Sequence, residues 1–322
     1  MVQRGRRLSA CQCTGIEGMI MITTLTLNPA FDVHVSVKDF RLGRETFAES
    51  VIRDVGGKGI NISRALLENN IENIAVVVLG SENSADFTYG MDEVGIKYKS
   101  VLCNGRIREN ITIHPEVGDE TRLSFKGFKC DASLLSRVEN LIDKKGVVTF
   151  TGSVPEGVET CQVEDFLMNL RESGVKLVID SKSVTLDMLR RIKPWLIKPN
   201  AEEINTYCGK EMSEKELYNT ARELNQDGIE NVMISLGENG AILAAEGTLY
   251  RACVPKINSL STIGAGDSTI AGFIACEGTT EERLRTAVSY GSAACLLEGT
   301  NPPLTEDIKK IFDNVKIQRI KL

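Results

Sequence analysis

The feature that most constrains the fold of this 322-residue chain is an alternation of short apolar runs with amphipathic stretches, which begins near residue 140. The apolar runs are typical of strands buried on both faces, as in a parallel sheet; they cover 147–150, 176–180, 195–197 and 232–236. Stretches with helical periodicity lie between and after them, at 160–173, 183–192, 201–208, 213–228, 267–277, 281–297 and 304–314. This order predicts an α/β fold: a doubly wound, mostly parallel sheet with helices on both faces.

The first half of the chain carries a second pattern. Segments 22–27 and 74–79 are apolar and fit the same large sheet, and a helix is predicted from about 60 to 70. Other segments alternate apolar and polar residues, which is typical of half-exposed antiparallel strands; they are 33–37, 45–53, 97–103, 110–114 and 121–125. We therefore expect a small inserted β-sheet, which could act as a lid, with strands from about 33–53 and 97–125.

Composition excludes several classes of function. Lysine and arginine number 38 against 44 aspartates and glutamates, a formal charge of −6 that argues against nucleic acid as the main partner. The nine cysteines are scattered without a Cys-x-x-Cys pair, and there are only two histidines, so neither a structural zinc site nor a cysteine-histidine nucleophile is expected. Reduced, mostly buried thiols are typical of a cytoplasmic protein.

The ends of the chain add two expectations. No run of about 18 apolar residues occurs, so no transmembrane helix or membrane partner is expected. Residues 1–18 are polar, aperiodic and without the apolar region of a secretory signal. They are predicted to be a disordered extension, with the folded domain spanning 19–322.

The most informative single segment for function is 261–272, where Gly264 and Gly266 lie in a loop that runs into a helical pattern. A glycine-rich loop that opens a helix leaves backbone N–H groups unpaired beside the positive end of the helix dipole, which favours an anion. Asp267 follows directly. Its carboxylate could cap the helix or accept a proton from a bound hydroxyl, and the segment alone does not decide between these roles.

Two loops in the first half could also contact a ligand. Asp32 follows the first strand, where it could be a turn former or a ligand-binding group. The segment 55–61 has three glycines in four positions, 56, 57 and 59, which permits close approach of the backbone to a ligand. Lys58 adds a cation to this loop, and Asn61 faces it if the helix begins at residue 60.

Further candidates follow other predicted strands. Arg108 and Arg122 belong to the small sheet, where they could be solvated or could close on a sugar phosphate. Ser153 follows a buried strand. Asn200 and Glu203 have the spacing of a helix capping box, and their oxygens could instead serve Mg²⁺ at a nucleotide phosphate. The turn 235–240 could be a simple hairpin turn or a nucleotide-contacting loop.

Taken together, the motifs resemble those of the PfkB (ribokinase-like) sugar kinases, most closely the members of that family that use fructose 1-phosphate. The resemblance covers roughly residues 20–320. The matching segments are Thr-Leu-Asn-Pro-Ala-Phe-Asp (26–32), Gly-Gly-Lys-Gly-Ile-Asn (56–61), Arg-x-Asn (108–110), Gly-Ser-x-Pro (152–155), Leu-Ile-Lys-Pro-Asn (196–200), Asn-x-x-Glu (200–203), Ser-Leu-Gly-x-x-Gly (235–240) and Gly-Ala-Gly-Asp-Ser (264–268).

The resemblance implies a ribokinase-like fold whose lid often mediates dimerisation, so a homodimer through the lid is expected. It implies ATP-dependent phosphorylation of a primary hydroxyl of a phosphosugar, with Mg²⁺. The expected reaction converts fructose 1-phosphate to fructose 1,6-bisphosphate. Tagatose 6-phosphate or fructose 6-phosphate could be the substrate instead, and a non-catalytic sugar- or nucleotide-binding protein is a more distant alternative.

The same resemblance implies a role for each matching residue. Asp267 would be the catalytic base, with the anion hole formed by Gly264, Ala265 and Gly266. The phosphosugar would be held by Asp32, Gly57, Lys58, Asn61, Arg108, Arg122 and Ser153. ATP would contact Lys198, Asn200, Ser235, Leu236, Gly237, Glu238, Asn239 and Gly240, and Glu203 would serve Mg²⁺, directly or through water.

Overall fold

The apolar runs assemble into one ten-stranded sheet in the computed structural model, which describes residues 21–320. The strands are β1 (Ile22–Thr26), β4 (Ile74–Gly80), β5 (Tyr98–Cys103), β8 (Val147–Thr151), β9 (Lys176–Asp180), β10 (Leu196–Ile197), β11 (Asn231–Ser235), β12 (Ala241–Ala245), β13 (Thr248–Cys253) and β14 (Lys316–Ile320). Their spatial order is β14-β13-β12-β11-β10-β9-β8-β1-β4-β5. From β11 to β5 all neighbours pair in parallel, whereas β12, β13 and β14 extend the sheet as antiparallel strands.

Ten helices of the described chain accompany these strands. They are α1 (Lys58–Glu68), α2 (Ser84–Glu93), α3 (Leu134–Glu139), α4 (Thr160–Glu172), α5 (Leu186–Ile192), α6 (Ala201–Cys208), α7 (Glu214–Gln226), α8 (Ala265–Ala275), α9 (Thr280–Ala294) and α10 (Thr305–Phe312). Helices α2 and α3 were not predicted from the sequence.

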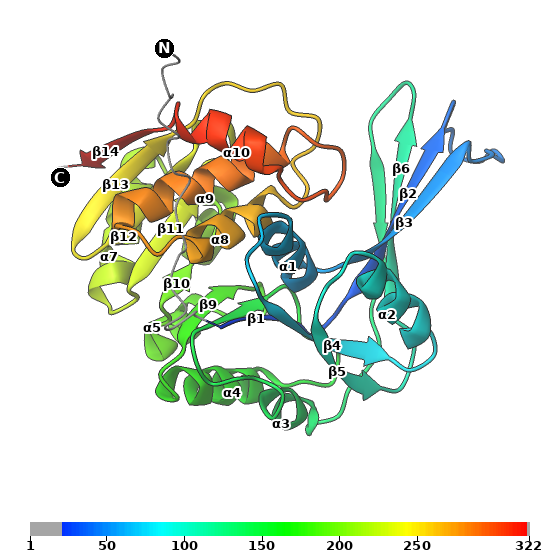
Figure 1. The fold of residues 1–322 in the computed structure, drawn as a ribbon, viewed down its shortest axis with the longest axis horizontal. Coiled ribbons are helices and arrows are strands. Elements are labelled where there is room, and N and C mark those ends of the chain that lie inside the picture. The colour runs from blue at the N-terminus through cyan, green and yellow to red at the C-terminus, as the bar shows by residue number, and fades with distance from the viewer. Residues whose placement is uncertain (1–20, 321–322) are drawn as a thin grey trace, which may run out of the picture.

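The helices cover both faces of the large sheet. Along β9, Leu177 and Ile179 belong to one apolar cluster and Val178 to another, as expected of a strand whose side chains alternate between two buried faces. One cluster contains side chains of α1, α8, α9 and α10, and the other contains side chains of α3, α4, α5 and α7. Figure 1 shows α8, α9 and α10 packed together on one side and α3 and α4 on the other. The prediction of a doubly wound α/β fold is confirmed.

A second, four-stranded sheet projects from this body (Figure 1). It consists of β3 (Ser50–Gly56), β2 (Ala30–Val37), β6 (Arg108–Pro115) and β7 (Thr121–Ser124), in that spatial order. The outer pairs are antiparallel, but β2 and β6 pair in parallel. The chain enters the small sheet directly from the carboxyl end of β1, so residues of this sheet lie close to that edge of the large one.

The prediction that segment 97–103 belongs to the small sheet was wrong. Segment 97–103 forms β5, which pairs in parallel with β4 at the edge of the large sheet. Its alternating pattern arises because an edge strand is covered on one face only: Val101 and Cys103 are buried, whereas Leu102 is 54% exposed. An alternation of apolar and polar residues indicates a strand that is exposed on one face. It does not distinguish an edge strand of a large sheet from a strand of a small sheet.

Two further expectations concern the ends of the chain and the membrane. The extension that the sequence predicts at 1–18 lies outside the described residues. Within residues 21–320, no helix is both long enough and apolar enough to cross a membrane.

Candidate functional site

Most of the predicted ligand-binding residues converge on one cavity of about 430 Å³. It lies where the carboxyl ends of the parallel strands face the base of the small sheet, the usual ligand position in an open α/β fold. The cavity is lined by Thr26, Asn28, Ala30, Asp32, Gly57, Lys58, Asn61, Arg108, Asn110, Arg122, Thr151, Gly152, Ser153, Asp180, Lys182, Lys198, Asn200, Glu203, Ile263, Gly264, Gly266, Asp267 and Thr300.

The glycine loop opens α8 inside this cavity. Gly264 adopts a left-handed conformation with φ 78° and is the residue before the first helical turn. No side chain caps this end of α8, and the first-turn amides of a helix have no intrahelical acceptor. The Ala265 N–H donates to the Thr262 carbonyl at 3.4 Å, whereas Gly264 and Gly266 line the cavity, so their amides are the ones best placed to meet an anion. A Cβ at Gly266 would lie 3.1 Å from Lys198 Nζ, which places an ammonium group beside these amides. Backbone dipoles and a buried cation therefore favour an anion at the same point.

Asp267 lies in the first turn of α8, and its carboxylate does not cap the helix, because Gly264 occupies the N-cap position. The side chain is buried, and Asn61 Nδ2 donates a hydrogen bond of 2.9 Å to Asp267 Oδ2. Asn61 reaches it from the first turn of α1, which begins at Lys58 rather than near residue 60. The packing of α1 against α8 thus aligns the two side chains.

The environment tunes the acidity of this carboxyl group. Burial raises the pKa of Asp267 to about 6, although the charges of Lys58 and Lys198 and the hydrogen bond from Asn61 oppose the shift. Asp180 nearby pushes the pKa further upward. A carboxylate with a pKa near 6 is ionised at neutral pH and holds a proton more strongly than an exposed one, which suits a general base.

Asp180 is a functional candidate that the sequence analysis did not include. It ends β9, is buried, and accepts a hydrogen bond of 2.9 Å from Lys58 Nζ; Lys198 Nζ lies 3.8 Å away. Burial by itself raises the pKa of Asp180, but the charges of Lys198 and Lys58 outweigh burial and hold that pKa below its usual range. Burial also disfavours the charged form of Lys58, and Asp180 and Asp267 restore it, so the pKa of Lys58 is raised. Asp180 therefore helps to keep Lys58 charged, and it lies beside two lysines that line the cavity.

The Gly-Gly-Lys-Gly loop allows α1 to start against β1. Gly57 has φ 127°, and a Cβ there would lie 2.7 Å from Thr26 Cγ2. A Cβ on Gly59 would lie 2.5 Å from the Leu25 carbonyl oxygen. Side chains at these positions would push α1 off the strand, so the glycines fix where Lys58 and Asn61 enter the cavity.

The small sheet contributes a polar cluster around Asp32. Asn110 Nδ2 donates to Asp32 Oδ1 at 2.9 Å, and Arg122 Nη2 lies 3.4 Å from the same oxygen. Arg108 donates through Nη2 to the Asn28 carbonyl and through Nη1 to the Phe125 carbonyl, each at 3.3 Å. Two guanidinium groups from adjacent strands therefore face the cavity, and both rest on protein oxygen atoms at its edge.

Several buried polar atoms around the cavity have no hydrogen-bond partner within the described chain. They are Thr26 Oγ1, Asn28 Oδ1, Asn61 Oδ1, Arg108 Nε, Asn110 Oδ1 and Thr151 Oγ1. Buried polar groups are normally paired, because leaving one unpaired costs about 1–3 kcal/mol. Their concentration around one cavity indicates that it receives a ligand or solvent with many hydrogen-bonding groups. Ser153 adds a hydroxyl, whose Oγ accepts a bond of 3.1 Å from Asn28 Nδ2.

Asn200 and Glu203 form a capping box at the start of α6. Glu203 N donates to Asn200 Oδ1 at 2.7 Å, and Asn200 N donates to Glu203 Oε2 at 3.0 Å. Both residues also line the cavity, so the capping interpretation and a ligand-binding role are compatible. The cap uses Oε2 of Glu203.

The 235–240 loop lies outside the cavity lining. Residues 237–239 form a short 3₁₀ turn between β11 and the antiparallel β12, so this segment is a hairpin connection. Ser235 pairs with Asn200 by an isolated bridge, and its N–H donates to the Pro199 carbonyl at 3.0 Å. The loop thus begins beside the Asn200 end of the cavity. Ala265, between the two glycines, is likewise absent from the lining.

Three of the lining residues that the sequence analysis missed share one recognisable signal. Thr26, Thr151 and Asp180 are each the last residue of a parallel strand, and all three line the cavity. A polar residue that ends a buried apolar run is therefore the pattern that would have found them. Lys182 and Thr300 lie in loops and carry no comparable signal.

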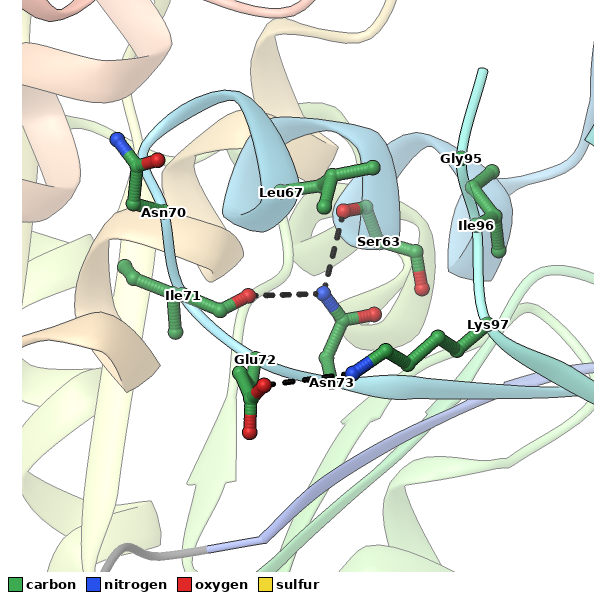
Figure 2. A pocket seen from close by; sticks show the side chains of 9 residues that line it. All are labelled: Ser63, Leu67, Asn70, Ile71, Glu72, Asn73, Gly95, Ile96 and Lys97. Carbon is green, nitrogen blue, oxygen red and sulfur yellow. Dashed lines mark hydrogen bonds and ion pairs between the residues drawn. The ribbon is translucent and has the colours of Figure 1, made fainter. Parts of the chain in front are cut away.

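A second cavity, of about 230 Å³, lies at the opposite edge of the sheet, beside the residues that precede β4 and β5 (Figure 2). Its centre is Asn73, whose amide donates to the carbonyls of Ser63 at 3.3 Å and Ile71 at 3.1 Å. Lys97 and Glu72 form an exposed ion pair at its rim. None of the predicted site residues lines it, and its polar groups are largely satisfied by one another.

Comparison with known proteins agrees with this geometry. Residues 37–307 match the pfkB family carbohydrate kinase pattern. The chain is 34% identical to a 1-phosphofructokinase of Haemophilus influenzae over 80% of this chain and 84% of that protein. It is 28% identical to a tagatose-6-phosphate kinase of Staphylococcus epidermidis over 92% of this chain and 99% of the relative.

Its fold matches the crystal structure of phosphofructokinase-2 from Escherichia coli in complex with substrates and products. The TM-score is 0.86 at 24% identity, over 92% of this chain and 99% of that one. The family pattern spans most of the chain, and most of the matching motifs contribute residues to one cavity. The chain therefore belongs to the pfkB family of carbohydrate kinases and is a phosphotransferase.

Proposed function

We propose that this protein transfers the γ-phosphoryl group of ATP to the 6-hydroxyl of fructose 1-phosphate, giving fructose 1,6-bisphosphate and ADP. The observation that carries the proposal is the position of Asp267: a buried carboxylate, with its pKa raised to about 6, beside a glycine loop that presents amide donors and a lysine. A base next to an anion cradle is the arrangement that phosphoryl transfer to an alcohol requires.

In the proposed reaction, Asp267 accepts the proton of the sugar hydroxyl as its oxygen attacks the γ-phosphorus. The new oxygen–phosphorus bond forms as the bond from the γ-phosphorus to the bridging oxygen breaks, and ADP leaves. The amides at Gly264, Ala265 and Gly266 and the ammonium group of Lys198 stabilise negative charge on the transferring group. Asn61 holds the carboxylate of Asp267 in position, since it is the side chain that donates to it.

The proposed sugar site is the half of the cavity formed by the small sheet and the starts of α1 and β2. Arg108, Arg122 and Lys58 are the cations available for the phosphate on the sugar. Asp32 and the unpaired oxygens of Asn28, Asn61 and Asn110 are suited to sugar hydroxyl groups, which can donate to them. Gly57 permits close approach, and Ser153 completes the rim.

The proposed ATP site occupies the other half, toward Lys198, Asn200 and the 235–240 loop that begins beside them. Among residues 21–320, no group of three or more His, Cys, Asp or Glu side chains could hold a metal ion. The residues present fit Mg²⁺ that arrives on nucleotide phosphates, because such an ion needs only one or two protein carboxylates. Glu203 is the proposed contact, directly or through water, and bound Mg²⁺ would neutralise charge on the phosphates.

The assembly proposed is a homodimer through the small sheet. Large apolar side chains are exposed on that sheet, on the loop between β2 and β3 and directly after β7, which is unusual for a monomer surface. They are Leu42, Phe47, Val51, Ile52, Leu123 and Phe125. We also propose a cytoplasmic location, which suits the seven described cysteines, all of them free thiols.

The direct test is a coupled assay of ADP release with fructose 1-phosphate, fructose 6-phosphate and tagatose 6-phosphate. We expect the highest kcat/KM with fructose 1-phosphate. Tagatose 6-phosphate is the second candidate, since a relative of similar length carries that name. Equal or higher kcat/KM with another sugar would reassign the substrate, and no ADP release with any of them would contradict the proposal.

The matched variant for this assay is Asp267→Asn. It keeps the size and hydrogen-bonding capacity of the side chain and removes the base. We expect kcat to fall by about 10²–10⁴-fold. Near-normal turnover in a folded Asp267→Asn protein would exclude Asp267 as the base.

A further inference from the structure

Two thiols lie at the base of the β6–β7 hairpin, on the two chain segments that join it to the α/β body. Cys103 is the last residue of β5, just before the chain enters β6, and Cys130 follows the chain's return from β7. The two segments are in contact, since a Cβ on Gly105 would lie 3.0 Å from Phe128 Cβ. We call residues 103–107 and 126–130 the hairpin neck.

The two sulfur atoms face each other across the neck. Cys130 Sγ lies 2.7 Å from Cys103 Sγ, although both are free thiols. A disulfide bond is about 2.05 Å long, so the sulfurs need to approach by less than about 1 Å. Cys103 is buried and Cys130 partly exposed, which leaves a small oxidant a route to the pair.

The surroundings distinguish the two sulfurs. Arg137 Nη2 on α3 lies 3.4 Å from Cys103 Sγ, and the same side chain donates through Nη1 to the Leu102 carbonyl at 3.1 Å. A guanidinium group in contact with a sulfur stabilises the negative charge of a thiolate. Burial and the neighbouring Cys103 raise the pKa of the Cys130 thiol. Because Arg137 contacts the sulfur of Cys103 and not that of Cys130, we assign Cys103 as the first nucleophile and Cys130 as the resolving thiol.

We propose that Cys103 and Cys130 are a redox modification site, which a peroxide converts to an intramolecular disulfide that closes the neck of the hairpin. The Cys103 thiolate attacks hydrogen peroxide; a sulfur–oxygen bond forms, the oxygen–oxygen bond breaks, and the departing hydroxide takes a proton. The Cys130 sulfur then attacks the sulfenic acid at Cys103, the sulfur–sulfur bond forms, and a second water leaves. Two thiols and one peroxide thus give one disulfide and two waters.

The position of the bond gives it a structural consequence. The hairpin that it closes carries Arg108, Asn110 and Arg122 into the main cavity. The neck is also tied to the loop of Ser153, because Cys130 N–H donates to the Glu156 carbonyl at 2.9 Å. A disulfide here joins residues 27 positions apart and restricts how far the hairpin can move relative to the body.

The test is peroxide titration of the folded protein, followed by alkylation and tryptic mapping without reduction. Trypsin cuts after Lys99, Arg106, Lys129 and Arg137, so the two cysteines fall in separate peptides, 100–106 and 130–137. We expect these peptides to be linked, with reversal by dithiothreitol and a rise in Tm of several degrees in the linked form. Cys130→Ser should abolish both effects, whereas Cys161→Ser, at an exposed cysteine, should leave them intact.

Two outcomes would overturn the proposal. One is that both thiols remain open to alkylation at peroxide concentrations that oxidise Cys161. The other is that the linked peptides form only after the protein is unfolded in urea. Neither readout depends on which sugar the enzyme uses, so failure here is distinct from failure of the proposed reaction.

Discussion

At the scale of single residues, the site depends on charges that are buried in a fixed arrangement. Asp267, Asp180, Lys58 and Lys198 come from four separate strand ends or helix starts. Asp180 and Asp267 raise the pKa of Lys58, and the two lysines lower the pKa of Asp180, so two carboxyl groups and two lysines lie close together and act on one another. Such an arrangement is ready to receive phosphate without reorganising the protein.

The raised pKa of Asp267 predicts a cost in stability as well as a role in catalysis. Its pKa is about 6 in the folded protein and 3.8 in its ordinary state. The folded state therefore binds more protons between these values, so stability is lost as pH rises from about 4 to 6. At neutral pH the cost is on the order of 3 kcal/mol, which Asp267→Asn should recover.

The measurement is urea unfolding of the parent protein and Asp267→Asn between pH 4 and 8. The variant should be more stable above pH 6, and the difference should shrink toward pH 4. A difference that is independent of pH, or a less stable variant at pH 7, would argue against a raised pKa.

Asp180 should behave in the opposite way, because its pKa is held below the usual range. Asp180→Asn removes one of the two carboxylates that face Lys58 and Lys198, and removal of one member of a buried ion pair typically costs about 3–5 kcal/mol. We expect lower stability at pH 7 and reduced kcat, and the stability difference should shrink in acid, as the parent carboxyl is protonated. Unchanged stability at pH 7, measured by urea unfolding, would contradict this network.

At the scale of elements, the first turns of three helices position many of the side chains that line the main cavity. Helices α1, α6 and α8 all begin at the carboxyl edge of the large sheet and bring their first turns to one cavity. Short connections place two of these helices: only one residue separates α1 from β3 of the small sheet, and α6 begins a few residues after β10. Helix α8 instead follows β13 through the longer loop 254–264.

At the start of α6, the structural role of Glu203 as a helix cap can be separated from its proposed role as a contact for Mg²⁺. Glu203→Gln keeps an oxygen that can accept from the Asn200 N–H, and glutamine is accepted in a capping box. It removes the charge that Mg²⁺ would use. We expect Tm to stay within about 1 °C while the Mg²⁺ concentration for half-maximal activity rises several-fold.

The control is Asn200→Ala, which removes the cap and should cost about 1 kcal/mol in unfolding free energy. Equal Mg²⁺ dependence in Glu203→Gln and the parent enzyme would leave Glu203 as a cap alone.

The start of α1 gives a prediction about backbone conformation. Gly57→Ala combines a positive φ with a methyl group 2.7 Å from Thr26 Cγ2, whereas Gly174→Ala has a positive φ and nothing within 4 Å. We expect Gly174→Ala to cost about 1 kcal/mol and Gly57→Ala at least about 2 kcal/mol, measured by urea unfolding. Similar costs for the two variants would mean that contact with Thr26 is not what requires glycine at position 57.

At the scale of the whole molecule, the small sheet is the part that the α/β body does not bury. Ile52 on β3 is 59% exposed, on a sheet edge rich in other exposed apolar side chains. Ile52→Glu should therefore convert a dimer to a monomer in light scattering, because it places a charge in the proposed interface. Leu304→Glu, at an exposed apolar site beside α10, is the matched control and should remain dimeric. A monomeric parent protein would contradict the proposed assembly.

The sequence by itself determined the α/β architecture, the positions of most strands and the family, because hydrophobic periodicity and glycine-rich motifs are local properties of the chain. It also identified most of the residues that line the cavity. The edge position of β5 and the pairing of β13 with β14 were decided by contacts between distant segments. So were the pairing of Asp180 with Lys58, across 122 residues, and the meeting of Asn61 with Asp267, across 206. Spatial proximity determines which groups form ion pairs and hydrogen bonds, and it also sets the pKa of a buried group. These properties therefore exist only in the folded chain.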